Sequence, residues 1–384
     1  MRYRLIQKLL ISFPLLLCPF FSAQSASPPR VARWAEKAAN DWYAKQPWLV
    51  GSNYIPANAI NELEMWQKDS FDPKRIDLEL GWAESIGLNT MRVFLHDLPW
   101  QEDPEGFRKR IDTFLQIAAK HHIKPLLVLF DSCWDPNPQL GKQRDPRPGV
   151  HNSGWVQSPG AKALEDQTQY PRLEKYVQGV VGAFANDTRI LGWDMWNEPD
   201  NANASDTREL KPEIKTEIVL KLLPRAFEWA RAMRPAQPLT SGVWTGDWSS
   251  PEKLSPMEKI QLELSDVISF HNYDKPEEFE KRVLWLEQFH RPILCTEYMA
   301  RSNGSTFQGT LPIARKYRVT AINWGFVAGK TQTYYPWDSW QHPYVEGQPA
   351  VWFHDIFQTS GQPYDEKEVI FIKQIIAGEN RPGH

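Results

Sequence analysis

Short apolar segments alternate with longer amphipathic segments along most of the chain. The apolar segments are rich in Val, Ile and Leu, a pattern typical of strands buried on both faces of a parallel sheet. The longer segments between them carry apolar residues at helical spacing. The pattern predicts eight strands, at residues 48–52, 89–95, 124–130, 190–195, 238–243, 267–270, 293–296 and 320–325.

Amphipathic helices are predicted between these strands, at 72–86, 104–120, 172–185, 214–233, 276–289 and 311–317. An extra helix is predicted before the first strand, at 30–45, and the tail closes with 349–357 and a helix at 365–377. Eight parallel strands alternating with helices predict the α/β class, as a (β/α)₈ TIM barrel. We expect a single domain with long βα loops, because no low-complexity linker divides the chain. The connection at 131–169 is too long to be a plain link, so it is either a substrate-binding loop or partly ordered locally. Its residues Trp134, His151, Asn152 and Trp155 favour binding.

The composition narrows the class of protein. With 384 residues, 24% charged and 41% hydrophobic, the chain is neither disordered, collagen-like nor a multi-span membrane protein. Its 18 tryptophans equal its 18 phenylalanines in number. A buried indole needs a partner for its N–H group, which makes Trp a costly core residue. A ligand with flat apolar faces and many hydroxyl groups would explain the excess.

The first residues resemble a targeting segment. Three basic side chains precede the apolar run 9–21, and small residues follow at 22–26. This order predicts a cleavable signal peptide at 1–26, a single mature domain at 27–384, and a secreted or periplasmic location. Lipid attachment at Cys18 is the disfavoured alternative, because Leu17 stands where a small residue would be needed.

Charge and cysteine usage limit the partners. The net charge of −3 becomes −6 without residues 1–26, so neither nucleic acid nor an anionic membrane is predicted as a partner, and no membrane span is predicted. The oligomeric state is left open. Cys133 and Cys295 would remain, and two cysteines at distant strands predict free, buried thiols rather than a disulfide framework.

Two glutamates follow predicted strands. Glu198 follows the fourth strand, within Trp196-Asn197-Glu198-Pro199, and Glu297 ends the seventh. Strands of a barrel present their carboxyl-terminal ends at one mouth, where active sites form. Paired carboxylates are what glycoside cleavage needs, because one donates a proton while the other attacks or stabilises the sugar centre.

Further polar and aromatic residues follow other strands. Side chains alternate along a strand, so Arg92 and His96 share one face of the second strand, and His271 and Tyr273 share one face after the sixth. Trp324 lies in the eighth strand. Tryptophans in predicted loops after strands are expected to touch a sugar in about half of the cases, Trp134 and Trp244 among them. For His96, lining of the site and plain packing are equally open.

These motifs together resemble clan A of the glycoside hydrolases, and most of all family 5, which contains cellulases and mannanases. The resemblance runs from about residue 48 to 324 and rests on Trp196-Asn197-Glu198-Pro199, Thr296-Glu297-Tyr298, His271, Tyr273, Arg92 and Trp324. One feature departs from it. Family 5 enzymes often present a histidine after the third strand, where this chain has Asp131-Ser132-Cys133.

The resemblance implies a retaining enzyme, with Glu198 as general acid/base and Glu297 as nucleophile. Asn197 would bind the sugar 2-hydroxyl group, and Arg92 and Tyr273 would orient Glu297 and lower its pKa. His271 would contact the acid/base or the sugar, and Trp324 would stack under the cleaved sugar. Glu198 would need a raised pKa to hold its proton.

The function predicted is therefore retaining hydrolysis of β-glycosidic bonds in a poly- or oligosaccharide, of the endo-glucanase, mannanase or xylanase kind. Two alternatives are an exo-acting β-glycosidase and a non-catalytic carbohydrate-binding barrel. A metal-dependent hydrolase is disfavoured, because Asp131, Asp135 and His151 lack a recognised ligand spacing. No metal and no cofactor are predicted.

Overall fold

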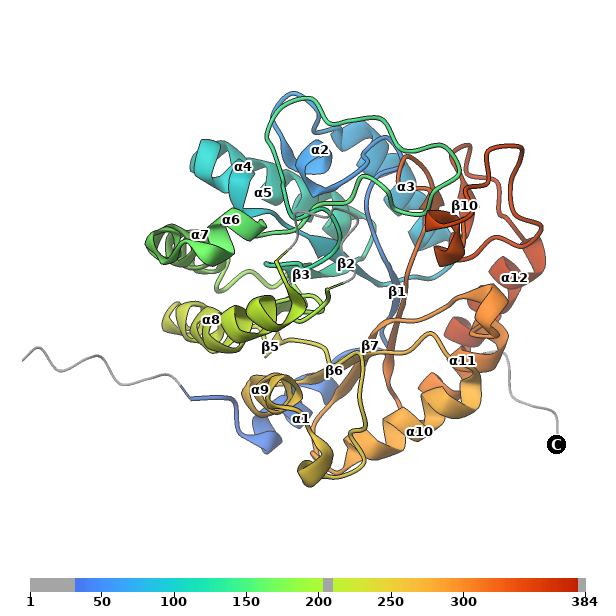
Figure 1. Ribbon diagram of the computed structural model, residues 1–384. Coiled ribbons are helices and arrows are strands. Elements are labelled where there is room, and N and C mark those ends of the chain that lie inside the picture. Colours follow the sequence, from blue (N-terminus) through green and yellow to red (C-terminus); the bar gives the residue numbers. More distant parts are fainter. Residues whose placement is uncertain (1–31, 203–209, 379–384) are drawn as a thin grey trace, which may run out of the picture. The chain divides into compact units, whose positions relative to one another are not determined.

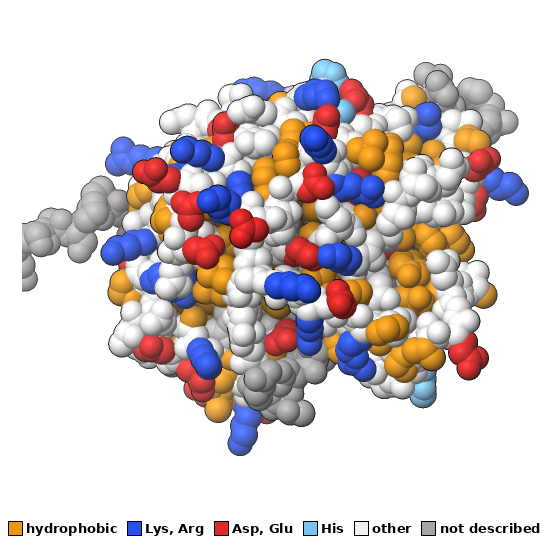
Figure 2. Space-filling view, turned by 90° about the horizontal axis from the view of Figure 1, so that it is seen from above, with side chains coloured by type: hydrophobic (Ala, Val, Ile, Leu, Met, Phe, Trp, Pro, Cys, Tyr) orange, Lys and Arg blue, Asp and Glu red, His pale blue; other side chains and the backbone are white. Residues whose placement is uncertain are grey.

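The computed structural model describes residues 32–202 and 210–378, which belong to one compact unit (Figure 1). The predicted signal peptide, with Cys18, lies outside the described residues. Among the described helices, none combines the length and the apolar character that crossing a membrane requires. Basic and acidic side chains are interspersed over the face seen in Figure 2.

Eight parallel strands form one sheet in the order β5-β4-β3-β2-β1-β8-β7-β6. All eight predicted strands are confirmed, with ends that differ by zero to three residues. Their bounds are β1 Val50–Asn53, β2 Thr90–Phe94, β3 Lys124–Val128, β4 Gly192–Asp194, β5 Leu239–Thr240, β6 Ile268–His271, β7 Ile293–Glu297 and β8 Thr320–Asn323.

The sheet closes between its edge strands, β5 and β6. Val243, just beyond β5, bridges Phe270 of β6 in parallel. Its N–H donates to the carbonyl of Ser269 at 3.1 Å, and its own carbonyl accepts from the N–H of His271 at 3.0 Å. These bonds join the two edges, so the predicted (β/α)₈ barrel is confirmed.

Helices surround the strands (Figure 1). Their bounds are α1 Glu36–Ala44, α2 Glu62–Trp66, α3 Pro73–Ser85, α4 Asp97–Glu102, α5 Pro104–Lys120, α6 Ala161–Glu165, α7 Tyr170–Ala183, α8 Pro212–Ala232, α9 Pro256–Leu264, α10 Pro276–Glu287, α11 Phe307–Lys316 and α12 Glu366–Ala377. All eight predicted helices are present. Those before β2 and β3 begin alike: the Asp72 and Asp103 carboxylates cap α3 and α5, and proline holds the first helical position of each.

Four helices were not predicted. Three of them, α2, α4 and α6, have only five or six residues, too few to show a helical period. The fourth, α9, begins with a capping box in which Ser255 and Glu258 bond each other's backbone N–H groups. This Ser-x-x-Glu spacing is visible in the sequence and could have revealed the helix.

The two ends of the barrel differ in character. At the amino-terminal end, Leu49, Leu126, Leu191, Val267, Leu294 and Ile322 form an apolar plug with Ala39 and Tyr43 of α1. The predicted extra helix therefore covers this end. At the carboxyl-terminal end, the loops after β3 and β8 are the long ones, at 131–169 and 330–347. These long loops can line a deep pocket at this second end.

Candidate active site

A pocket of about 600 Å³ lies at the carboxyl-terminal ends of the strands. It is lined by Asn197, Glu198, Asn201, Tyr273 and Glu297, by Trp134, Trp155, Trp244, Trp324, Trp337 and Trp340, and by Cys133, His151, Asn152, Asp338 and Gln341. Seven of the ten predicted site residues are in this lining, whereas Arg92, His96 and His271 are not.

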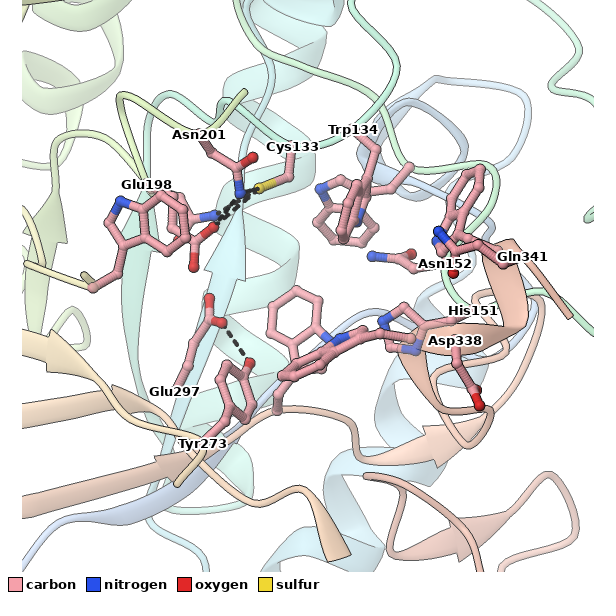
Figure 3. A pocket seen from close by; sticks show the side chains of 16 residues that line it. Cys133, Trp134, His151, Asn152, Glu198, Asn201, Tyr273, Glu297, Asp338 and Gln341 are labelled. Carbon is pink, nitrogen blue, oxygen red and sulfur yellow. Dashed lines mark hydrogen bonds between the residues drawn. The ribbon is translucent and has the colours of Figure 1, made fainter. Parts of the chain in front are cut away.

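The carboxyl groups of the two glutamates lie close together at one side of the pocket (Figure 3). Glu297 is the last residue of β7, and Glu198 lies four residues beyond the end of β4. A carboxylate oxygen from each lies within 4.8 Å of the other. The carboxyl groups of retaining glycosidases are about 5–5.5 Å apart, whereas those of inverting enzymes are about 6.5–9.5 Å apart. The spacing therefore fits the retaining geometry.

Glu297 is held by a cation and a phenol. The Arg92 guanidinium donates to Oε1 at 2.7 Å, and the Tyr273 hydroxyl donates to Oε2 at 2.6 Å. Both donors favour the ionised carboxylate. Burial acts in the opposite direction and is the larger effect, so the pKa of Glu297 is raised. Arg92 lowers this pKa, as expected, but burial outweighs its effect.

Glu198 has a different set of partners. His271 Nδ1 lies 2.9 Å from Oε1, the Asn201 amide donates to Oε2 at 2.5 Å, and Cys133 Sγ lies 3.4 Å from Oε2. Burial raises the pKa of Glu198 and lowers the pKa of His271 to about 4. The imidazole is therefore neutral at neutral pH and adds no cation that would favour ionised Glu198.

Arg92 lies inside the barrel, completely buried, and joins four strand ends. Besides Glu297, it donates to Asp194 at 2.9 Å, to Asn53 at 3.1 Å and to Asn197 at 2.8 Å. The sequence analysis missed Asp194 as its second counterion. The sequence did contain a signal for this role, because Asp194 is an acidic residue within an apolar strand and lies two strands from Arg92.

Asp131 and Asn201 are two further residues that the sequence analysis missed. Asp131 accepts from the Asn197 amide at 2.9 Å and from the Trp155 indole at 2.6 Å, and therefore fixes the rotamer of Asn197. Burial raises the pKa of Asp131 to about 6. Asn201 contacts both Glu198 and Cys133 Sγ, the latter at 3.2 Å. Nothing in its loop sequence indicated that role.

The aromatic residues fall into two groups. Trp324 lines the pocket and contacts Phe94 and Trp155, with ring centroids 5.8 Å apart in each pair. Trp134 and Trp244 also line the pocket, as predicted, and the Trp244 indole donates to Asp200 at 2.8 Å. Trp100 and Trp248, from the loops after β2 and β5, are instead buried against helices or strands.

His96 is a correction to the predicted site. Its side chain is completely buried and does not line the pocket. The ring caps α4, where Nδ1 accepts from the N–H of Leu98 at 3.1 Å, and Nε2 lies 3.1 Å from the carbonyl of Gln157. The chain turns into α4 directly after β2, so the alternation that placed His96 beside Arg92 ends before it. The structure supports the packing alternative for this residue.

The predicted free thiols are confirmed, since Cys133 and Cys295 are both buried and unpaired. Among the described residues, Glu198, His271 and Glu297 are the group whose ligand atoms lie close enough to share a metal ion. Arg92 already supplies Glu297 with a positive charge. Asp131, Asp135 and His151 do not form such a group; the His151 ring is bonded to the carbonyl of Tyr335 at 2.8 Å.

Comparison with known proteins places this site in a family. The family model of cellulase (glycosyl hydrolase family 5) matches residues 149–343, half of the chain. Mannan endo-1,4-β-mannosidase A of Hypocrea jecorina is 24% identical over 216 residues. The match covers 51% of this chain and 44% of that protein, so the chain spans less than half the length of this relative.

Solved structures share the fold at low identity. A variant of the GH5_18 protein from Streptomyces cattleya, in complex with Manβ1-4GlcNAc, has a TM-score of 0.60 at 11% identity, covering 88% of this chain and 82% of that one. An exo-β-1,4-mannosidase from Opitutaceae bacterium strain TAV5 has a TM-score of 0.57 at 18% identity, covering 86% and 59%. The endo-1,4-β-mannanase of Rhizomucor miehei has a TM-score of 0.52 at 14% identity, covering 86% and 98%. The chain therefore belongs to glycosyl hydrolase family 5, a family of retaining glycoside hydrolases.

Proposed function

We propose that this protein hydrolyses β-mannosidic bonds with retention of configuration, using Glu198 as general acid/base and Glu297 as nucleophile. The spacing of the two carboxylates, within 4.8 Å, is the observation that carries the reaction type. The family supports hydrolysis of a glycoside. The choice of mannose rests on the relatives, because an endo-mannosidase, an exo-mannosidase and a protein bound to Manβ1-4GlcNAc are among them.

In the first step, a Glu297 oxygen attacks the anomeric carbon and forms the glycosyl ester, while the glycosidic carbon–oxygen bond breaks. Protonated Glu198 gives its proton to the departing oxygen. Burial raises the pKa of Glu198, which helps it to keep that proton until the bond breaks.

In the second step, Glu198 acts as a base. The charge of Glu297 is absent from the ester, so ionised Glu198 no longer has a like charge beside it. It takes a proton from a water molecule, the resulting hydroxide attacks the anomeric carbon, and the ester bond to Glu297 breaks. Two inversions give net retention, and both carboxyl groups return to their starting states.

The surrounding residues prepare these steps. Arg92 and Tyr273 hold the two oxygens of Glu297 and offset part of the burial effect on its pKa. Asn197, whose rotamer Asp131 and Arg92 fix, is proposed to bind the sugar 2-hydroxyl group. Trp324 offers an aromatic floor on which the sugar ring stacks. His271 is proposed to position Glu198 through its Nδ1 contact.

The site is proposed to meet its substrate outside the cytoplasm. This proposal rests on the basic, apolar and small-residue order at 1–26, which is typical of a signal peptide. A carbohydrate is the partner that the pocket supports.

Glu297→Ala and Glu198→Ala test the assignment on aryl β-mannosides, with β-glucosides, β-xylosides and β-galactosides as competing substrates. Each change should lower kcat at least about a hundredfold. Aryl groups that leave without a proton should largely restore the first step in Glu198→Ala but not in Glu297→Ala. Azide should rescue Glu297→Ala and give an inverted glycosyl azide.

Glu165→Ala is the control, because Glu165 is exposed in the loop after β3. Unchanged rates in either glutamate variant would refute the assigned roles. Sugar binding without turnover by the wild-type protein would identify a carbohydrate-binding barrel instead. Faster hydrolysis of another β-glycoside would refute the choice of mannose alone.

A further inference from the structure

The long loops after β3 and β8 are joined by hydrogen bonds. The N–H of Asn152 donates to the carbonyl of Thr331 at 2.7 Å, and the N–H of Tyr344 donates to the carbonyl of Gly149 at 3.0 Å. The Gln332 amide adds a bond to the carbonyl of Arg147 at 2.9 Å. In the barrel order, β1 and β2 lie between β8 and β3. The joined loops, defined as the 149–152/331–344 wall, therefore bridge that side of the mouth.

Side chains extend this wall into the pocket. Trp134 from the loop after β3 packs against Trp340 from the loop after β8, with ring centroids 5.8 Å apart. The Arg147 guanidinium lies 5.3 Å above the Trp340 ring. Trp134 and Trp340 both line the pocket. The wall is thus a packed surface rather than two loops that happen to lie close.

The inner surface of the wall carries polar groups without partners. Asn152 is 1% exposed and lines the pocket, and neither its amide nitrogen nor its amide oxygen has a hydrogen-bond partner. The indole N–H of Trp340 is also buried and unpartnered. A buried polar group left unpaired costs about 1–3 kcal/mol. Unpaired donors and an acceptor on two residues that line the same pocket fit a ligand with several hydroxyl groups.

Asn152 is held in this position by its backbone. Its φ angle of 47° lies in the left-handed region, which Asn adopts more readily than most residues. Its own N–H is bonded across the wall to Thr331. In Figure 3 the Asn152 side chain extends towards the centre of the pocket. The unpaired amide is therefore presented to the pocket by a fixed backbone.

The direction of the substrate follows from the proton donor. Glu198 must lie beside the oxygen that leaves, so the leaving group occupies the Glu198 side of the pocket, where Asn201 also lies. Figure 3 shows Asn152 and Gln341 on the opposite side. The sugar that is attacked therefore points its non-reducing end at the wall.

We propose that the 149–152/331–344 wall ends the site after one sugar ring, and that Asn152 and the Trp340 indole bind hydroxyl groups of the non-reducing terminal sugar. The protein then removes single sugars from chain ends. This inference rests on the proposed function, because the direction of the substrate depends on Glu198 as the proton donor. It selects exo action over the internal cleavage first expected.

Reducing-end-labelled β-1,4-manno-oligosaccharides test the proposal with the full wild-type chain. The expected products are mannose and a ladder of labelled oligosaccharides that shortens one unit at a time. A substrate methylated on the terminal 4-hydroxyl group should be cleaved at least about tenfold more slowly, because the proposed site ends at that hydroxyl group. Labelled internal fragments at early times would overturn exo action and leave the proposed function standing. No cleavage of these or of aryl β-mannosides would overturn both.

Asn152→Gly tests the assigned residue, because glycine tolerates the left-handed backbone while removing the amide. Its KM for an aryl β-mannoside should rise about tenfold, the loss expected for one or two hydrogen bonds. Trp340→Phe, which removes the indole N–H group together with part of the ring, should raise KM several-fold. The matched control is Asn137→Gly, in the same loop, whose amide nitrogen is also buried and unpartnered but does not line the pocket. Equal effects of Asn137→Gly and Asn152→Gly would overturn the assignment.

Discussion

At the scale of single residues, the two glutamates differ in the groups that adjust their titration. Burial raises the pKa of both carboxyl groups. Tyr273 opposes this effect at Glu297, and Asn201 opposes it at Glu198, each by donating a hydrogen bond to the ionised form. Tyr273 and Asn201 can each be replaced separately. The acid limb and the alkaline limb of the pH profile of kcat/KM can therefore be tested one at a time.

Tyr273→Phe should move the acid limb of kcat/KM to higher pH. The ionised form of Glu297 is the nucleophile, and loss of the phenol raises the pKa of Glu297 further above its ordinary value. A hydrogen bond to a charged group contributes about 1.5–3 kcal/mol, which corresponds to about one to two pH units. kcat should also fall about tenfold or more. An unmoved acid limb would show that Tyr273 does not act on Glu297.

Asn201→Ala should move the alkaline limb to higher pH. The protonated form of Glu198 is the acid, and loss of the amide donor raises its pKa further, so the proton is kept to higher pH. We expect a shift of about one unit. The exposed Asn303→Ala is the control and should leave the profile unchanged. A downward shift in Asn201→Ala would contradict this account of Glu198.

At the scale of elements, the 149–152/331–344 wall depends on a close approach of two backbones. Gly149 has a φ angle of 70°, and a Cβ there would lie 2.4 Å from the carbonyl carbon of Tyr344. The two loops must therefore move apart if Gly149 acquires a side chain.

Gly149→Ala should open the wall locally without unfolding the barrel. Hydrogen exchange at Asn152 and Tyr344, whose N–H groups bond across the wall, should speed up about tenfold or more. KM for the aryl β-mannoside should rise in parallel. Gly347→Ala, in the loop after β8, is the control, because a Cβ at Gly347 meets nothing within 4 Å. Unchanged exchange in Gly149→Ala would mean that the loops are not held by this contact.

At the scale of the whole molecule, Arg301 joins the exit of β7 to the C-terminal segment. Its guanidinium bonds Glu368 of α12 at 2.6 Å and the carbonyls of Trp352 and Asp355 at 3.0 Å. The Arg301 and Glu368 side chains are only 6% and 9% exposed. Removing the arginine leaves a buried carboxylate without its cation.

Arg301→Ala should lower the thermal stability of the whole barrel. Breaking a buried ion pair costs about 3–5 kcal/mol, which for a chain of this length corresponds to a fall in Tm of about 4–7 °C. Calorimetry measures the change. The double variant Arg301→Met, Glu368→Leu should recover most of the loss, whereas Lys281→Ala, at an exposed ion pair with Glu278, should leave Tm within about 1 °C. An unchanged Tm in Arg301→Ala would show that the C-terminal segment is held by other contacts.

The fold could be read from the sequence because each strand buries both faces and therefore appears as an apolar run. The end of β5 was the least accurate: only Leu239–Thr240 is paired as a strand, while the predicted apolar run extends to residue 243. An apolar run shows that residues are buried, but it does not show that they pair as a strand. The residues directly beyond this strand end are buried without continuing the hydrogen bonds between strands. Short helices such as α2 and α4 were not predicted, because a helix of one or two turns is too short to show a helical period in its apolar residues.

The sequence by itself determined the barrel, the positions of Glu198 and Glu297 after their strands, and the presence of Arg92, Tyr273 and Trp324. The order of strands along the chain and the alternation of side chains within a strand can both be read from neighbouring residues. Tertiary structure alone decided which distant loops meet. The tertiary structure makes His96 a helix cap and brings Asp131 and Asn201 to the site. It also buries Glu297 and thereby raises its pKa, which no local pattern reveals. It also joined the loops after β3 and β8 into a wall that presents Asn152. Contacts of this kind depend on the close approach of backbones nearly 200 residues apart, which the spacing of residues along a chain does not encode.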